Sequence, residues 1–77
     1  KIEIITDEIF DLLNLKSFNL YNNNILFIPS KINNLINLTE LDLSWNKITK
    51  INNEVFCLTN LKILNMAGNE ISEIPLN

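Results

Sequence analysis

The amino-acid sequence predicts an α/β solenoid, with short parallel strands stacked on one side and short helical turns on the other. Apolar residues return at a period of 23 across all 77 residues, and each period joins a strand-like alternation to a helix-like spacing. We therefore expect one domain, residues 1–77, made of a partial repeat at 1–14, full repeats at 15–37 and 38–60, and a truncated repeat at 61–77.

The strands are expected early in each repeat, at Ser17–Tyr21, Glu40–Ser44 and Ile63–Ala67. Alternate side chains of a strand point to opposite faces, and one of the two sets is apolar throughout. The apolar set should face the core, and it comprises Phe18, Leu20, Leu41, Leu43, Leu64 and Met66. The other set should face solvent on the concave side of the sheet, and it comprises Ser17, Asn19, Glu40, Asp42, Ile63 and Asn65.

The segments that return from one strand to the next carry apolar residues three or four positions apart. This spacing predicts 3₁₀ or short helical turns on the convex side, with one face packed on the strand layer. Thr6, Ser30 and Asn52 are candidate caps for these turns, and Pro29 and Pro75 suit positions near their starts.

The same spacing of leucine-like residues and asparagine recurs in the three units as LKSFNLYNN, LTELDLSWN and LKILNMAGN. This LxxLxLxxN pattern resembles the signature of the leucine-rich-repeat family, and the return segments resemble IxxIP-type repeats. The resemblance implies a horseshoe fragment with a parallel sheet on its concave side. It also implies that Asn23, Asn46 and Asn69 form a ladder of hydrogen bonds between side chains and backbone.

Composition argues against several functional classes. The net charge is -3 and all six basic residues are lysine, so a surface for nucleic acid is not expected. No apolar run is long enough to cross a membrane, and no cofactor or metal site is predicted. Cys57 is the single cysteine, so no disulfide can form within the chain. We expect an ordinary, partly exposed thiol and a cytoplasmic location.

The repeat array begins on the convex half of one coil and ends before the next convex half. Solenoids usually carry polar capping elements at both ends, and none is seen in this sequence. We therefore expect an excerpt of a longer protein whose uncapped ends can self-associate.

The concave face holds the candidate binding residues. Glu40 and Asp42 lie two apart on one strand, but without a histidine or oxyanion donor nearby they indicate an acidic patch instead of a catalytic pair. Tyr21 and Trp45 should be near neighbours, either as binding anchors or as covers for the sheet edge. The predicted partner-binding residues are Ser17, Asn19, Tyr21, Glu40, Asp42, Ser44, Trp45, Ile63 and Asn65.

The favoured function is a non-enzymatic scaffold for protein–protein interaction, whose concave face binds a basic or amphipathic segment of a partner. Repeats of the IxxIP type are common in cytoplasmic signalling proteins, which supports this hypothesis by analogy. An alternative is the targeting or regulatory arm of a larger enzyme, such as a phosphatase, kinase, cyclase or nuclease. A surface adhesin is a third hypothesis.

Overall fold

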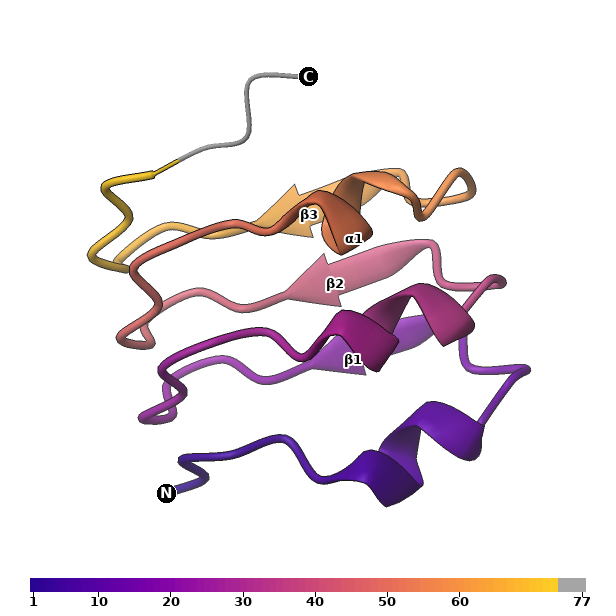
Figure 1. The fold of residues 1–77 in the computed structure, drawn as a ribbon, viewed down its shortest axis with the longest axis horizontal. Helices are drawn as coiled ribbons and strands as arrows, with labels where there is room; N and C mark the ends of the chain where they lie inside the picture. Colours follow the sequence, from indigo (N-terminus) through magenta and orange to yellow (C-terminus); the bar gives the residue numbers. More distant parts are fainter. Residues whose placement is uncertain (74–77) are drawn as a thin grey trace.

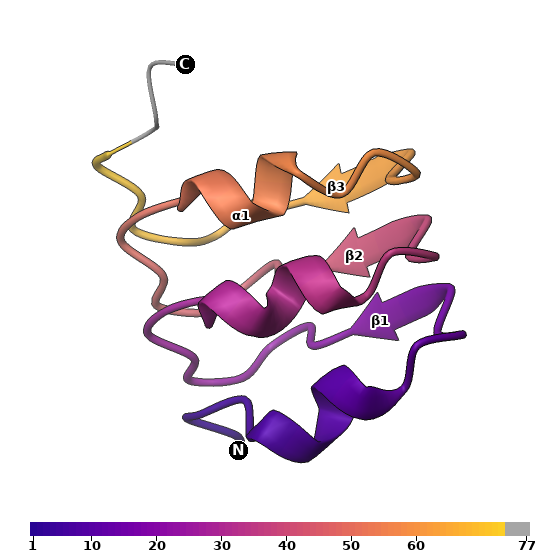
Figure 2. The same ribbon diagram turned by 45° about the vertical axis from the view of Figure 1, so that its right-hand side comes forward.

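The computed structural model describes residues 1–73, which form a two-layered stack of coils that rises from the N-terminal coil at the bottom of Figure 1. Strands β1 (Ser17–Asn19), β2 (Glu40–Asp42) and β3 (Ile63–Asn65) form one parallel sheet in the order β1-β2-β3. The second layer contains the helical turns, which run alongside the strands in both views (Figures 1 and 2). These turns are η1 (Asp7–Asp11), η2 (Ser30–Asn34) and α1 (Asn53–Phe56).

The pairing of the strands reproduces the sequence period. Ser17 pairs with Glu40, and Glu40 pairs with Ile63, so each step along the sheet is a shift of 23 residues. The helical turns obey the same period, since they begin at residues 7, 30 and 53. The predicted parallel solenoid with 3₁₀ and short helical turns opposite the sheet is therefore confirmed.

Each strand begins where the sequence predicts and ends two residues earlier. The cause is a side-chain turn at the last strand residue: Asn19 Oδ1 accepts the N–H of Tyr21 at 2.9 Å, and Asn65 Oδ1 accepts the N–H of Ala67 at 3.1 Å. Such Asx turns compete with regular strand geometry. Hydrogen bonds between coils nevertheless continue beyond the strand ends, for example from the Leu20 N–H to the Asp42 carbonyl at 2.8 Å.

The starts of the helical turns are only partly as predicted. Thr6 and Asn52 occupy the N-cap positions, but neither side chain makes a capping hydrogen bond. The N-cap of η2 is Pro29 and not Ser30, because this turn keeps the offset of the other coils and Ser30 becomes its first residue. Pro75 lies outside the described residues.

The core fills the space between the two layers. Leu41 in β2 and Leu43 just after it are at most 1% exposed. They pack in the same core as residues of the return segments such as Ile48 and Val55, which are equally buried. Burying a side chain of this size contributes about 1.5–3 kcal/mol. The core therefore holds the strand layer rigidly and fixes the direction of the side chains on its other face.

The first coil has an apolar end face. A hollow of about 300 Å³ is lined there almost wholly by aliphatic and aromatic side chains. Its lining residues are Ile2, Ile4, Ile5, Thr6, Ile9, Phe18 and Leu20. Ile2 and Ile4 are 47% and 61% exposed, so apolar surface meets solvent at this end.

Candidate partner-binding face

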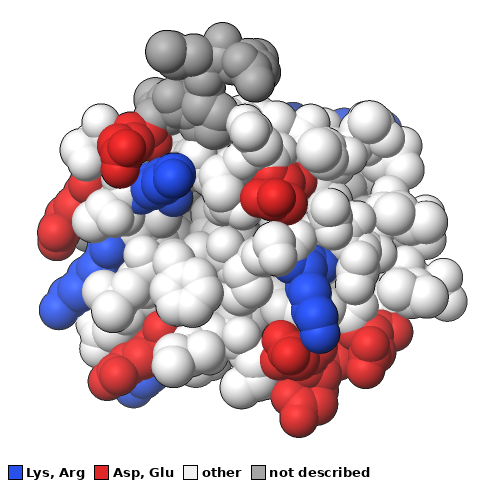
Figure 3. Space-filling view, in the orientation of Figure 1, with Lys and Arg blue, Asp and Glu red and all other residues white. Residues whose placement is uncertain are grey.

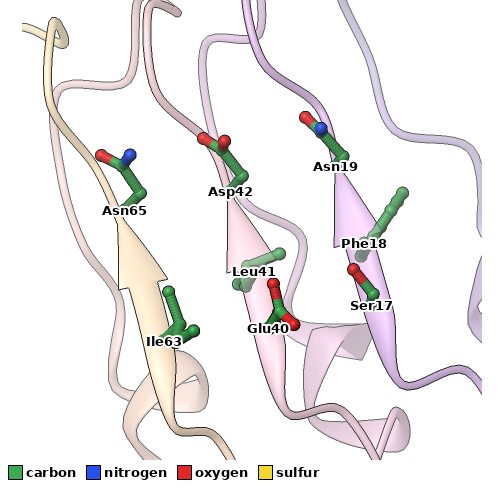
Figure 4. Close-up of a pocket in the computed structure, with 8 residues that line it drawn as sticks. All are labelled: Ser17, Phe18, Asn19, Glu40, Leu41, Asp42, Ile63 and Asn65. Atoms are coloured by element: carbon green, nitrogen blue, oxygen red, sulfur yellow. The ribbon is translucent and has the colours of Figure 1, made fainter.

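The solvent side of the sheet presents two rows of side chains across the three coils. Ser17, Glu40 and Ile63 form one row and are all exposed, and two positions further along the strands Asn19, Asp42 and Asn65 form the second. The two rows line a shallow hollow of about 130 Å³, and Figure 4 shows them across the strands that carry them. The structure thus brings together six of the nine predicted partner-binding residues.

Residues in the second row also hold the turns that end the strands. Asp42 Oδ1 accepts hydrogen bonds from the Ser44 N–H at 3.0 Å and from the Ser44 hydroxyl at 2.5 Å. Ser44 itself is only 3% exposed. Its inclusion among the surface contact residues therefore has to be corrected, because its side chain supports Asp42 from inside the fold.

Trp45 has an unusual backbone conformation at the rim of this face. Its φ is 58°, in the left-handed region, where a bulky side chain costs roughly 1–2 kcal/mol. The equivalent residues of the neighbouring coils, Asn22 and Gly68, have φ of 60° and 70°. The turn before each ladder asparagine therefore requires this conformation, which Asn and Gly adopt more readily than Trp.

The indole of Trp45 extends over the following coil. A Cβ built at Gly68 would lie only 2.5 Å from Trp45 Cδ2, so the ring occupies the space that a side chain there would need. The ring of Trp45 therefore extends away from Tyr21, which belongs to the preceding coil. Tyr21 and Trp45 are 55% and 59% exposed, so neither ring is buried by the contacts that it makes.

Asn23, Asn46 and Asn69 connect successive coils through their side-chain amides. Asn46 is 5% exposed, accepts the N–H of Ile25 at 3.1 Å and donates to the carbonyls of Leu20 and Leu43 at 3.0 Å each. Asn23 and Asn69 accept the N–H of Ile2 and Ile48 in the same way, both at 3.0 Å. These bonds satisfy backbone groups of the turn after each strand, which is a structural role.

A second set of asparagines joins the coils on the opposite edge. Asn37 donates to the Leu13 carbonyl at 2.9 Å, and Asn60 donates to the Ile36 carbonyl at 2.8 Å. This role was missed in the sequence, although asparagine recurs there at the same period. Asn37 is also the acceptor residue of a glycosylation sequon, and its amide is engaged in this bond.

Lysines lie at the amino-terminal ends of the outer strands. A hollow of about 350 Å³ near this edge is lined by both lysines, by the two asparagines of the second set, by two threonines and by a leucine. Its lining residues are Lys16, Asn37, Thr39, Thr59, Asn60, Leu61 and Lys62. Lys16 and Lys62 therefore flank the concave face at this edge.

Charged side chains on the helical side lie mainly towards its margins (Figure 3). Lys31 and Asp7 form an exposed salt bridge of 3.3 Å between η2 and η1. In α1, the pKa of Glu54 is lowered because its carboxylate accepts a hydrogen bond of 2.6 Å from the Asn52 amide and another from its own backbone N–H. Cys57, next to α1, is exposed and unbonded.

Residues 1–73 offer no metal site and no membrane-spanning helix. No group of three or more His, Cys, Asp or Glu side chains is placed there to hold a metal ion. In the same residues, no helix is long and apolar enough to cross a membrane.

Comparison with known proteins agrees with this geometry. The family model for the leucine-rich repeat matches residues 14–71, and the chain belongs to the leucine-rich-repeat family. No curated protein matches the sequence. Among solved structures, a leucine-rich-repeat protein of Leptospira interrogans is similar, with a TM-score of 0.88 and 34% sequence identity. The match covers 92% of this chain and 18% of that chain, so the present chain corresponds to a small part of its length.

Proposed function

We propose that this chain is a protein-binding module whose concave sheet face docks a partner protein. The observation that carries the proposal is the row Ser17, Glu40 and Ile63, which a rigid parallel sheet displays in register and exposed to solvent. A surface held by a packed core loses little conformational entropy when it binds. The leucine-rich repeat is a common interaction module, which supports the same function.

The proposed contact surface has a polar centre and an aromatic rim. Ser17, Glu40 and Ile63 form the centre, and Tyr21 and Trp45 supply exposed rings of the kind that dominate interface energetics. Asn19, Asp42 and Asn65 add the side-chain atoms that do not take part in their turns. Ser44 is not part of the proposed contact surface, because it is buried. Within residues 1–73 no cation pairs with the acidic groups of the middle strand, which favours a partner segment that is basic or amphipathic.

We propose further that the module acts as a scaffold in the cytoplasm and has no enzymatic role of its own. A free, exposed cysteine suits a reducing compartment. No feature of the concave face favours catalysis, because its two carboxylates have no partner acid, base or oxyanion donor in the hollow that they line. The hypothesis of an arm of a larger enzyme receives no support from the site.

The apolar end face of the first coil supports a tendency to self-associate. Two exposed isoleucines, Ile2 and Ile4, border its hollow. In sedimentation velocity, the isolated chain should shift to larger species as its concentration rises. A sedimentation coefficient that does not change with concentration would remove self-association from the proposal.

Affinity capture with charge-matched variants tests the binding face. The concave variant is Glu40→Lys with Ile63→Glu, and the control on the helical side is Asp11→Lys with Asn53→Glu, so both change the net charge equally at exposed positions. A partner of the concave face should be captured from the source-cell lysate by the wild type and by the control, and lost by the concave variant. Circular dichroism checks that both variants are folded.

A partner that all three proteins retain would contradict the proposed face. A partner that the helical-side control loses, and the concave variant keeps, would move the binding site to the opposite layer.

A further inference from the structure

Trp45 departs from a pattern that the neighbouring coils share. All three coils place a residue with positive φ before the ladder asparagine, and the other two use Asn22 and Gly68. Those residue types suit a left-handed conformation, whereas tryptophan does not. Because the same turn forms without an aromatic residue in the adjacent coils, the turn does not explain the presence of Trp45. Strained residues of this kind cluster at binding sites.

The indole of Trp45 lies face down on Gly68. A Cβ at Gly68 would be 2.5 Å from Cδ2, 2.7 Å from Cε3 and 2.9 Å from Cε2 of the ring. Cδ2 is bonded to three other ring atoms, so an atom that is closest to Cδ2 must lie above or below the ring plane. Gly68 therefore covers one face of the indole. Since Trp45 is 59% exposed, the other face is open to solvent.

The carboxylate of Asp42 lies three residues before Trp45 in the chain and is bonded to the residue next to it. Asp42 is hydrogen-bonded to the backbone N–H of Ser44, the residue that precedes Trp45. Both hydrogen bonds from Ser44 reach Oδ1, and within residues 1–73 no donor reaches Oδ2. Across that part of the chain the salt bridge found is Lys31 with Asp7, so Asp42 has no cationic partner there.

The charged residues beside the strands differ between the two ends of the sheet. Lys16 and Lys62 precede β1 and β3, at the amino-terminal ends of the strands. Asp42 ends β2 at the opposite, carboxyl-terminal side, where Trp45 follows. At this end of β2 the charge of Asp42 favours a positive group of a partner beside the ring.

We infer that Asp42 and the open face of Trp45 together bind an arginine side chain of the partner protein. A planar guanidinium stacks on an indole face and at the same time donates an N–H to a nearby carboxylate. A lysine ammonium is more strongly hydrated and cannot stack, so arginine is the better ligand. The inference rests on the proposed protein-binding function and names the chemistry that the concave face recognises.

Gly68 is the positioning residue of this site. Because its lack of a side chain lets the indole lie flat on the backbone, any larger residue at this position has to displace the ring. Asn22 and Gly68 also show which substitutions at position 45 preserve the turn, so Trp45→Asn removes the ring and keeps a residue that the chain itself uses in this conformation.

Short peptides test the site directly. The probe is the capped pentapeptide Gly-Ser-Arg-Ser-Gly, and its controls replace arginine by lysine or by citrulline, which has nearly the same shape without the charge. Trp45 is the only tryptophan, so its fluorescence reports binding. The arginine peptide should give a saturable change in fluorescence and bind about tenfold more tightly than the citrulline peptide.

Two variants sharpen the result. Asp42→Asn keeps the Oδ1 acceptor for Ser44 and removes the charge, so it should weaken the arginine peptide about tenfold and leave the citrulline peptide unchanged. For Trp45→Asn, binding is followed by nuclear magnetic resonance of the backbone amides, and the preference for arginine should disappear. Circular dichroism confirms the fold of both.

Equal binding of the arginine and citrulline peptides, or no saturation by the arginine peptide, would overturn the inference. Equal binding of the lysine peptide would overturn the assignment to arginine. These failures are separate from failure of the proposed function, because that function is judged by partner capture with the Glu40 and Ile63 variant and does not depend on the peptides.

Discussion

The two faces of the sheet differ in how closely the coils repeat one another. On the core face, Phe18, Leu41 and Leu64 occupy equivalent places, and all are large and apolar. On the concave face, the equivalent residues are Ser17, Glu40 and Ile63, which share neither charge nor polarity. A packed interior admits only residues of suitable size and polarity, whereas solvent imposes no such limit. The repeated positions therefore maintain the fold, and the varied ones are free to carry recognition.

The largest expected difference in the free energy of unfolding is between truncations on the two faces of the sheet. Leu41 is 1% exposed, and Leu41→Ala should lower the free energy of unfolding by roughly 2–5 kcal/mol through lost burial and the cavity left behind. Ile63 is 56% exposed, and Ile63→Ala should change the free energy of unfolding by less than about 0.5 kcal/mol. Urea unfolding followed by circular dichroism measures both, and equal losses would contradict the distinction between the faces.

The asparagine ladder should give the next largest effect. Asn46→Ala leaves the carbonyls of Leu20 and Leu43 and the N–H of Ile25 without this partner in a buried turn. The expected loss is about 2–4 kcal/mol in the free energy of unfolding. Asn23→Ala should have a smaller effect, because solvent reaches the more exposed Asn23 and can replace the lost hydrogen bonds. The same urea titration compares them, and a larger loss at Asn23 would conflict with this account.

Much of the fold was predictable because every coil solves the same packing problem. The period of 23 residues located the starts of all three strands and the two layers correctly. The strands end earlier than the period alone predicts, because Asn19 and Asn65 form Asx turns that interrupt the strand geometry. The bonds of Asn37 and Asn60 could have been predicted from their recurrence, which is the same signal that identified the first ladder.

The contact between Trp45 and Gly68 should appear as coupling between two substitutions. Gly68→Ala introduces a Cβ into the space of the indole and a side chain at φ of 70°, so a loss of about 1–3 kcal/mol in unfolding free energy is expected. In the Trp45→Asn background only the backbone effect remains, and the loss should fall to about 1 kcal/mol. A double-mutant cycle measures the difference, and additive effects would show that the two residues do not contact each other.

The site was less predictable than the fold for a physical reason. The side chain of Trp45 could be placed on the concave rim from sequence, but its direction depends on the empty space above Gly68 in the next coil. The left-handed turn itself had a signal, because asparagine and glycine occupy the equivalent positions. The burial of Ser44 had no such signal in the sequence. The equivalent residues of the neighbouring coils, Tyr21 and Ala67, are both exposed.

The smallest effect concerns the acid range of pH. The pKa of Glu54 is lowered in the folded chain, first of all by the hydrogen bond from Asn52. A lowered pKa means that the stabilising contribution is present above the ordinary pKa of glutamate and is lost as pH falls through the folded value. Asn52→Ala should raise the pKa of Glu54, as followed by the carboxyl carbon resonance in a pH titration. An unchanged titration curve would exclude the hydrogen bond as the cause.

Site-specific photocross-linking tests the central claim most directly, because it reports contact and not stability. A benzophenone amino acid is placed at Ile63 on the concave face or at Asn33 on the helical side, two exposed positions on opposite layers. With the captured partner bound, illumination should link the partner to the chain labelled at position 63 and not to the chain labelled at position 33. Linkage from position 33 alone would place the partner on the helical layer and contradict the account.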